Sequence, residues 1–158
     1  MIFLKAIKDK SAADMEARII NQDQSLAGML SLLKSNKLPF QDVKLESGLF
    51  ISYHDENGEI IGSGGLEFYS VYALLRSVAV DKTQRGKAFG KEIVTDLLNR
   101  AKSRSIKEIY LLTETAHAFF LKQGFSDISR HDVPVEVKTS SEFGSICGVS
   151  AVCMVYRS

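Results

Sequence analysis

Residues Leu74–Lys91 read LLRSVAVDKTQRGKAFGK, and the expected topology of the chain follows from how this segment folds. It begins as an apolar run typical of a strand, passes through a polar turn and a basic, glycine-containing turn at Arg85–Gly90, and continues as an amphipathic helix. The first turn of a helix has backbone N–H groups without an intrahelical partner, and the helix dipole adds partial positive charge there. Small residues at positions 86, 88 and 90 let an anion approach this backbone. The segment therefore predicts a phosphate site, with a diphosphate as the first candidate ligand.

Two common phosphate-binding loops do not fit this segment. A Walker A loop has four residues between its glycines and a Ser or Thr after the Lys, whereas Gly86 and Gly90 enclose three residues and Glu92 follows Lys91. The dinucleotide fingerprint requires a Gly where Ala88 stands. Arg85, Lys87 and Lys91 add positive charge around the turn. An ordinary strand–turn–helix corner with basic surface residues remains the alternative interpretation.

The overall composition indicates one ordinary globular domain. The chain has 158 residues with 45% hydrophobic and 25% charged residues, and we assign residues 1–15 to an N-terminal extension and 16–158 to a single domain. A net charge of +1 gives no broad basic field for nucleic acid or an anionic membrane. No apolar run approaches the roughly 20 residues of a membrane span, and no signal peptide is evident. We expect a cytoplasmic protein in which Cys147 and Cys153 are free thiols.

The remaining segments alternate between strand and helix patterns. An Asn-Gly pair at Asn57–Gly58 between two apolar runs predicts a β-hairpin, and glycines at 62, 64 and 65 suggest a bulge or a close backbone approach in its second strand. Asp23 is expected to cap the first helix. Further segments are expected as strands at 17–20, 72–80, 108–112, 125–128 and 150–156, as helices at 89–101 and 116–122, and as one helical turn within 134–143. This order predicts an α+β fold with a mixed sheet.

Two blocks resemble the GCN5-related N-acetyltransferases, the GNAT superfamily. Arg85–Gly90 is similar to the Q/R-x-x-G-x-G/A segment of that family, and Thr115–Phe125, TAHAFFLKQGF, resembles its A-x-x-F-Y-x-x-x-G-F segment. The resemblance implies the GNAT fold, a mostly antiparallel mixed sheet of six to seven strands flanked by helices. It also implies that acetyl-CoA is bound between the fourth and fifth strands, without a metal. The cofactor-binding residues so implied are Val78, Ala79, Val80, Arg85, Gly86, Lys87, Ala88, Phe89, Gly90, Lys91 and Phe120.

The chain departs from the family pattern at two positions. Ala88 stands where the family usually has a Gly, and we expect Ala to be tolerated there with a negative φ. Phe120 stands where many members carry a Tyr that protonates the departing CoA thiolate, and a phenyl ring cannot donate a proton. Another group or water donates that proton, or the thiolate departs unassisted. Tyr72 is the side chain we consider as a substitute donor.

The catalytic and acceptor-binding candidates are charged residues of the predicted sheet. Glu67 is the preferred general base, directly or through water, with Glu114 as the second choice; the alternatives are a half-exposed strand carboxylate and a solvated loop acid. Arg76 lies within an apolar strand, where a guanidinium is costly without a partner. It could bind an acceptor carboxylate or form an internal ion pair with Glu67 or another acid, and these roles are compatible.

The wider sequence is similar to small amino-acid N-acetyltransferases, including those that accompany arsenic-resistance genes, and to the acetyltransferase domain of N-acetylglutamate synthase. This resemblance implies an amino-acid-like acceptor and direct attack of its amine on acetyl-CoA. The histidines lack metal-ligand spacing, and no base accompanies a cysteine, so neither a metal centre nor an acetyl-enzyme is expected. An acyl-CoA-binding regulatory module and a protein-directed acetyltransferase remain alternatives. A homodimer is left open.

Overall fold

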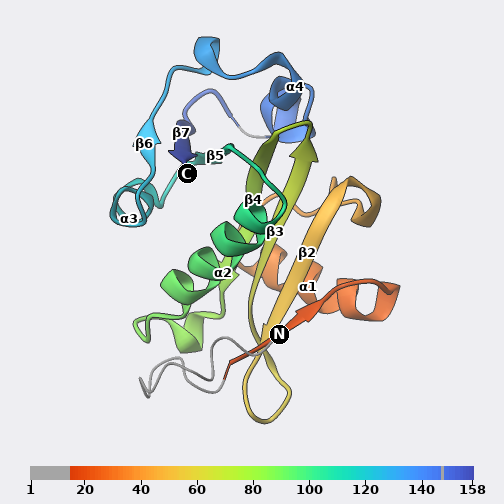
Figure 1. Cartoon of the computed structure of the whole chain (residues 1–158). Coiled ribbons are helices and arrows are strands. Elements are labelled where there is room, and N and C mark those ends of the chain that lie inside the picture. The colour runs from red at the N-terminus through yellow and green to blue at the C-terminus, as the bar shows by residue number, and fades with distance from the viewer. Residues whose placement is uncertain (1–14, 147) are drawn as a thin grey trace.

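The computed structural model describes residues 15–146 and 148–158, so nearly all of the expected N-terminal extension and Cys147 lie outside the described residues. Within these residues a seven-stranded sheet has the order β1-β2-β3-β4-β5-β7-β6, with α1 on one face and α2 on the other (Figure 1). Only β4 and β5 pair in parallel; the other neighbours are antiparallel. The expected α+β fold with a mixed, mostly antiparallel sheet is confirmed.

The strands and helices agree with most of the expected segments. The strands are β1 Glu16–Ile19, β2 Gly48–His54, β3 Ile60–Tyr69, β4 Tyr72–Val80, β5 Glu108–Thr113, β6 Ser126–Asp127 and β7 Val152–Arg157. The helices are α1 Asp23–Ser35, α2 Phe89–Ser103, α3 His117–Lys122 and α4 Val135–Lys138, followed by a π-helical turn at Glu142–Ile146. No helix in the described part of the chain is long and apolar enough to cross a membrane.

The structure tests the expected start of the first helix and the expected free thiol of Cys153. The N-cap position of α1 is Gln22 rather than the expected Asp23, because Gln22 has the extended backbone of an N-cap and the helix begins at Asp23. Cys153 is a free thiol, as expected, and it is buried in the core on the α4 side of the sheet.

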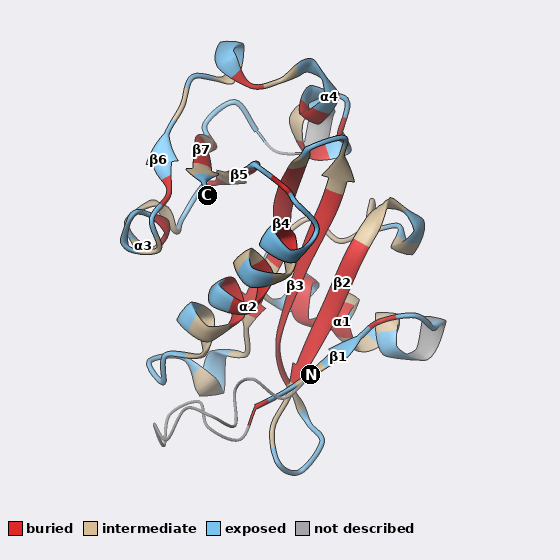
Figure 2. Cartoon of the chain, viewed as in Figure 1, coloured by how far each residue is buried: buried red, intermediate tan, exposed pale blue. Residues whose placement is uncertain are grey.

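Alternation along β2 divides the core between the two faces of the sheet. Leu49, Ile51 and Tyr53 belong to the cluster under α2, whereas Phe50 belongs to the cluster under α1. Figure 2 shows that the central strands β2–β4 are buried for most of their length. This period of two is the pattern of a strand covered on both faces.

The glycines of β3 allow α2 to approach the sheet closely. A Cβ at Gly62 would lie 2.5 Å from Ile93 Cδ1, and one at Gly64 would lie 2.4 Å from Leu97 Cδ1. A Cβ at either position would force the side chain of Ile93 or Leu97 on α2 to shift. The close backbone approach predicted from these glycines is confirmed.

A β-bulge interrupts β4 directly after Arg76. Gly65 pairs with Arg76 but Ser63 pairs with Ala79, so β4 contains one extra residue, and Ser77 has a φ of 60°. The Ser77 carbonyl accepts a hydrogen bond of 2.7 Å from Ser63 Oγ. The bulge reverses the alternation of side chains, which places Arg76 and Ala79 on the same face of the sheet despite their odd spacing.

The parallel strands β4 and β5 form a fork. They pair only from Tyr72–Glu108 to Leu74–Tyr110, whereas β4 continues to Val80 and β5 continues along β7 to Thr113. Beyond Leu74, the backbone of β4 therefore makes no strand pairing with β5. An unpaired strand edge next to a gap can accept an extended ligand as an additional strand.

Candidate functional site

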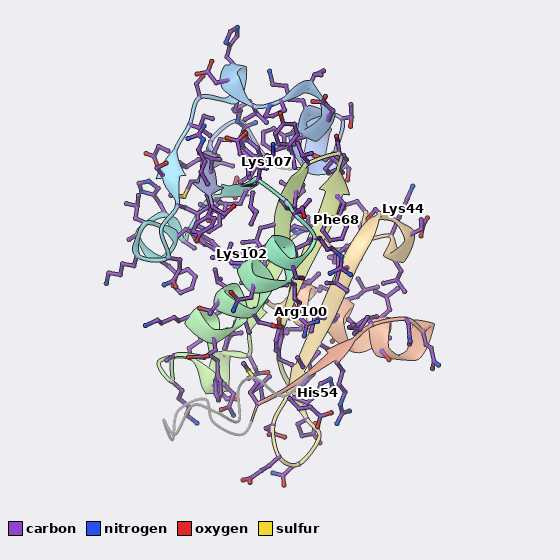
Figure 3. The ribbon with its side chains drawn as sticks, in the orientation of Figure 1. Lys44, His54, Phe68, Arg100, Lys102 and Lys107 are labelled. Carbon is purple, nitrogen blue, oxygen red and sulfur yellow. The ribbon has the colours of Figure 1, made fainter. Side chains whose placement is uncertain are left out.

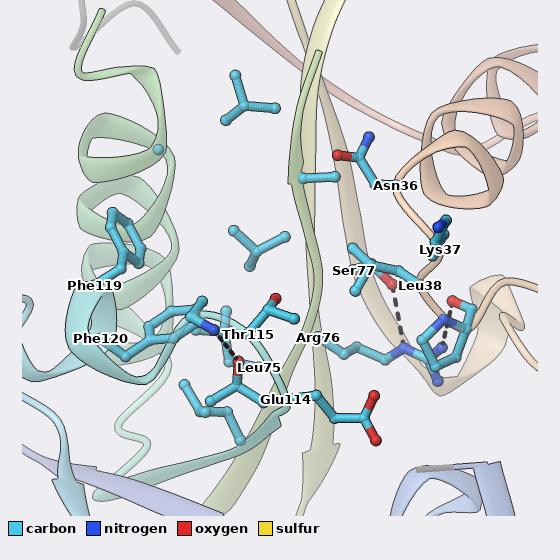
Figure 4. A pocket seen from close by; sticks show the side chains of 18 of the residues that line it. Asn36, Lys37, Leu38, Leu75, Arg76, Ser77, Glu114, Thr115, Phe119 and Phe120 are labelled. Carbon is cyan, nitrogen blue, oxygen red and sulfur yellow. Dashed lines mark hydrogen bonds between the residues drawn. The ribbon is translucent and has the colours of Figure 1, made fainter. Parts of the chain in front are cut away.

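A cleft of about 1220 Å³ lies in the fork between β4 and β5 and reaches both faces of the sheet. Its walls are β4 from Leu75 to Val80, the end of β5 with α3, the turn before α2 and the segment that follows α1. Figure 4 shows Phe119 and Phe120 on one side of β4 and Asn36 and Lys37 on the other. The fork itself therefore produces an opening through the sheet.

The turn before α2 has the backbone of an anion site. Gly86 has a φ of 81°, and Ala88 is the N-cap of α2 with φ 63° and ψ 12°. The expectation of a negative φ at Ala88 is wrong, because the chain must turn through the left-handed region to enter the helix there. This conformation costs a residue with a Cβ about 1–2 kcal/mol. No side chain caps α2, which is compatible with an anion interacting with its first N–H groups.

Four cationic side chains line the cleft near this turn. They are Lys34, Lys37, Arg85 and Lys91. Arg85 donates a hydrogen bond to Asn36 Oδ1, which joins the end of α1 to the turn. Lys87 does not line the cleft, and its ammonium lies 3.1 Å from Gln84 Oε1. Of the three basic residues expected around an anion, two thus lie on the cleft wall.

The other expected cofactor residues lie on the cleft wall as well. Val78, Ala79 and Val80 contribute the β4 side, and Gly86, Ala88, Phe89 and Gly90 contribute the turn. Phe120 is buried, and its ring is 5.0 Å from that of Phe119 in an edge-to-face arrangement. An apolar wall of this kind excludes water from the middle of the cleft.

Arg76 is the centre of a buried ion cluster at the other end of the cleft. Its Nη1 lies 2.6 Å from Asp42 Oδ2 and its Nη2 lies 2.8 Å from Asp42 Oδ1, so the two side chains form a bidentate ion pair. Nη1 is also 3.1 Å from Glu67 Oε2, and Nε is 3.4 Å from Glu142 Oε2. The Arg76 side chain has no exposed surface. The internal ion pair anticipated for this arginine is therefore present, with three carboxylates.

Glu67 contacts Arg76 but, unlike Arg76, does not line the cleft. It is buried, and its oxygens accept hydrogen bonds from Tyr69 Oη at 2.8 Å and Ser47 Oγ at 3.4 Å as well as from Arg76. Its diagonal position across the β3–β4 pair explains its contact with the guanidinium. The geometry favours a role in holding Arg76 over direct contact with a ligand.

The cluster shifts the pKa values of its members in opposite directions. Burial would raise the pKa of Asp42, but hydrogen bonds from Arg76 and Ser141 outweigh it and hold the pKa below its usual 3.8. Burial would lower the pKa of Arg76, but Asp42, Glu142 and Glu67 raise it overall. Burial and the Glu67 carboxylate raise the pKa of Tyr69. Asp42 and Arg76 are therefore expected to remain ionised near neutral pH.

Glu114 and Tyr72, the remaining predicted residues, differ in position. Glu114 lines the cleft at the end of β5, and its Oε1 accepts a hydrogen bond of 3.2 Å from Ser150 Oγ. Tyr72 does not line the cleft. It lies where β4 and β5 are still joined, with its ring 6.2 Å from that of Tyr110. The fork opens only beyond this point, so the geometry argues against Tyr72 as a proton donor in the cleft.

Three residues of the site were not predicted from the sequence. Asp42 lies in the loop after α1, Glu142 in the π-helical turn, and Asn36 directly after α1. Asp42 and Glu142 meet at Arg76, whereas Asn36 meets Arg85. No local pattern marks them, since each is an isolated polar residue in a turn or loop. The lone arginine in an apolar strand was the one signal that acids had to converge there.

Residues 30–125 match the acetyltransferase (GNAT) family. The match covers more than half of the chain, including the fork, the basic turn and α3. The chain belongs to the GNAT acetyltransferase family. The resemblance to the GNAT superfamily is thereby confirmed.

A curated relative is the amino-acid acetyltransferase of Mycobacterium tuberculosis, which is 31% identical over 108 residues. These residues are 67% of this chain and 60% of that protein, so the match spans less than two thirds of the relative's length.

Solved structures share the fold. The GNAT acetyltransferase of Staphylococcus aureus has a TM-score of 0.69 at 19% identity, covering 90% of this chain and 98% of that one. Rv2747 of Mycobacterium tuberculosis, crystallised with CoA and NLQ, has a TM-score of 0.71 at 21% identity, covering 90% and 99%. The N-acetylglutamate synthase of Neisseria gonorrhoeae, complexed with coenzyme A and N-acetyl-glutamate, has a TM-score of 0.73 at 13% identity, covering 90% of this chain and 35% of that one.

Proposed function

We propose that this protein transfers the acetyl group of acetyl-CoA to the amine of a small, amino-acid-like compound. The observation that supports the proposal most directly is the fork between β4 and β5. A single cleft there joins the turn and helix start at Gly86–Gly90 to the polar residues around Arg76. The family membership and the amino-acid acetyltransferase relative support the same reaction.

In this proposal the diphosphate of acetyl-CoA binds to the first N–H groups of α2, with Arg85 and Lys91 as counter-charges. The pantetheine arm pairs with the unpaired edge of β4 at Val78–Val80. Along a strand, the distance from Val80 back to Arg76 is roughly 13 Å, so the thioester end reaches the region of the bulge. A backbone N–H near Val78 is our candidate for stabilising the oxyanion.

The amine of the acceptor attacks the thioester carbonyl directly. The new C–N bond forms, the C–S bond breaks, and the electron pair of that bond leaves on sulfur as CoA thiolate. We propose Glu114 as the acceptor of the ammonium proton, through water, because it lines the cleft and is exposed. Glu67 is proposed as a positioning residue for Arg76 rather than the base.

Phe120 has no proton to donate to the thiolate. We propose that the thiolate leaves unassisted, since a thiol near pKa 8.5 is a far better leaving group than an amine. A cytoplasmic location is part of the proposal, because the reaction consumes acetyl-CoA. Whether two copies associate is left to measurement of the mass in solution.

The decisive experiment follows release of CoA thiol from acetyl-CoA with a panel of small amines. We expect turnover above the rate of hydrolysis with at least one amine, and a thermal shift with acetyl-CoA alone. Arg85→Gln should weaken acetyl-CoA binding about tenfold, whereas Lys82→Gln, in the turn before it, should have little effect. A thermal shift without turnover for any amine would instead favour an acyl-CoA-binding regulatory module.

A further inference from the structure

The turn before α2 contacts the end of α1 through Arg85 and Asn36. Arg85 Nη2 donates a hydrogen bond to Asn36 Oδ1, although the two residues are 49 positions apart in the sequence. Both residues line the cleft, and Asn36 lies directly after α1 (Figure 4). Because α1 and α2 cover opposite faces of the sheet, this contact connects the two faces at the cleft.

The Asn36 side chain is held in place from the α1 side. Its Nδ2 lies 2.9 Å from the Leu32 carbonyl, and its backbone N–H donates to the carbonyls of Leu32 and Leu33 at 3.2 and 3.1 Å. A carbonyl can only accept a hydrogen bond, and a guanidinium can only donate one. The amide therefore has one favourable orientation, with Nδ2 toward α1 and Oδ1 toward Arg85.

The contact with Asn36 restricts an otherwise mobile type of side chain. Arg85 is exposed, and an exposed arginine samples many rotamers and loses that freedom when it binds a ligand. The last carbonyls of α1 also carry the negative end of the helix dipole, which attracts a nearby cation. Because the guanidinium is ordered before a ligand binds, the entropic cost of ordering it around an anion is smaller.

The hydrogen-bond partner of Arg85 is a neutral amide, whereas Arg76 is paired with carboxylates. An amide orients a guanidinium without neutralising it, and this contact uses one of several N–H groups. Asp81 interacts with Arg85 through its charge, but Asp81 Oδ1 accepts hydrogen bonds from Thr83 N at 2.9 Å and Thr83 Oγ1 at 2.6 Å. The contact with Asn36 thus orients Arg85 at the cleft wall without cancelling its charge.

We propose that Asn36 is a positioning residue for Arg85 and, through Arg85, for the diphosphate of acetyl-CoA. The inference rests on the proposed function, in which Arg85 is a counter-charge of that diphosphate. It goes beyond that function by giving the end of α1, on the face of the sheet opposite α2, a part in binding the cofactor. Asn36 itself does not contact the cofactor in this proposal.

The test is a double-mutant cycle on the binding of CoA, measured by isothermal titration calorimetry. The four proteins are wild type, Asn36→Ala, Arg85→Gln and the double variant. We expect Asn36→Ala to raise the Kd for CoA about threefold and Arg85→Gln to raise it about tenfold. The double variant should bind CoA no more weakly than Arg85→Gln alone, because Asn36 acts only through the guanidinium.

Ser35→Ala is the matched control for an effect on the end of α1. Ser35 Oγ donates a hydrogen bond of 2.9 Å to the same Leu32 carbonyl, but Ser35 does not line the cleft. Its replacement should leave the Kd for CoA unchanged. Thermal unfolding of each variant without ligand measures any loss of stability separately.

Asn36→Asp provides a second variant of nearly the same size. A carboxylate at this position would compete with the diphosphate for Arg85 and repel it. Asn36→Asp should therefore bind CoA more weakly than Asn36→Ala does. If Asn36 only completed the end of α1, Asp would be tolerated at least as well as Ala, and this result would overturn the inference.

The outcomes separate this inference from the proposed function. If Arg85→Gln weakens CoA binding but Asn36→Ala does not, the positioning role is wrong while the cofactor site stands. An equal effect of Asn36→Ala with and without Arg85 also overturns it, because Asn36 then acts independently of the guanidinium. If wild type does not bind CoA, or Arg85→Gln binds it equally well, the proposed diphosphate site fails and the inference fails with it.

Discussion

Arg76 in β4 and Asp42 in the loop after α1 form a bidentate ion pair, although they are 34 residues apart in the sequence. The Nη1–Oδ2 distance is 2.6 Å and the Nη2–Oδ1 distance is 2.8 Å. The guanidinium is completely buried, and the carboxylate faces the cleft. The pair therefore fixes the loop that forms one wall of the cleft. Both Nη atoms of the arginine contact Asp42 in this structure.

Replacing Arg76 by Met should destabilise the protein by about 3–5 kcal/mol, because it leaves buried carboxylates without their counter-charge. The matched control is Arg18→Met. Arg18 also pairs with an acid, Glu16, but both side chains are about half exposed, and such pairs contribute less than about 1 kcal/mol. Urea unfolding of both variants near neutral pH measures the difference. Equal effects of the two substitutions would show that the cluster does not stabilise the fold.

Ala88→Gly should stabilise the protein by about 0.5–1 kcal/mol, because Gly adopts the φ of 63° without the steric cost that Ala has there. The reciprocal change, Gly86→Ala, should destabilise by a similar amount. Position 86 has a φ of 81°, and an added Cβ would meet nothing within 4 Å, so backbone strain is the only expected effect. Thermal unfolding checks both signs. A loss of stability in Ala88→Gly would contradict the left-handed turn.

Tyr53 should stabilise the fold up to alkaline pH through its hydrogen bond to Asp96. The Tyr53 hydroxyl lies 2.7 Å from Asp96 Oδ2, and Arg100, labelled on α2 in Figure 3, lies 2.9 Å from the other oxygen of that carboxylate. Tyr53→Phe should cost about 1.5–3 kcal/mol near neutral pH, since a hydrogen bond to a charged group is lost.

The Tyr53→Phe variant also tests how the stability contributed by the Tyr53 hydroxyl depends on pH. Burial and the Asp96 charge raise the pKa of Tyr53 well above 10.0. When folding raises the pKa of a group, its contribution to stability is fully present below the pKa of the unfolded state. That contribution is lost as the pH rises from there toward the pKa of the folded state. The difference in unfolding free energy between wild type and Tyr53→Phe should therefore shrink above pH 10. A difference that stays constant through this range would contradict the buried, neutral phenol.

Phe120→Tyr should change kcat by less than about threefold, because we propose that the CoA thiolate needs no proton donor. Positioned acids usually contribute about 10²–10⁴-fold when proton transfer limits a reaction. The measurement is thiol release at saturating substrates, with the acetyl-CoA thermal shift as the control for binding. An increase of a hundredfold would indicate that the wild type lacks an acid that its chemistry requires.

Local patterns in the chain predicted much of the fold. The Asn-Gly turn, the amphipathic period of α2 and the glycines of β3 each depend on residues close in sequence, and each was confirmed. The expected strand at β4 was correct in its bounds, but the bulge at Ser77 was not anticipated at that strand. The extra residue there follows from pairing with β3, which no pattern within β4 encodes.

The candidate site was predictable at one end and not at the other. Glycine, small and basic residues near Gly86 are contiguous, so their chemistry could be inferred before the fold was known. The left-handed φ of Ala88 escaped that inference, because it depends on the angle at which α2 leaves the turn. At the bulge, Arg76 signalled a need for acids, and Glu67 was anticipated as a partner, whereas Asp42 and Glu142 were not.

The order of residues thus specified the strands, the helices and the basic, glycine-containing turn before α2, since hydrogen bonding and burial within a short segment decide them. The long-range fold added Asp42 and Glu142 to Glu67 as partners of Arg76. The reason is physical: a desolvated guanidinium binds whichever carboxylates the folded chain brings within about 3 Å, and that proximity is a property of the assembled sheet and its loops.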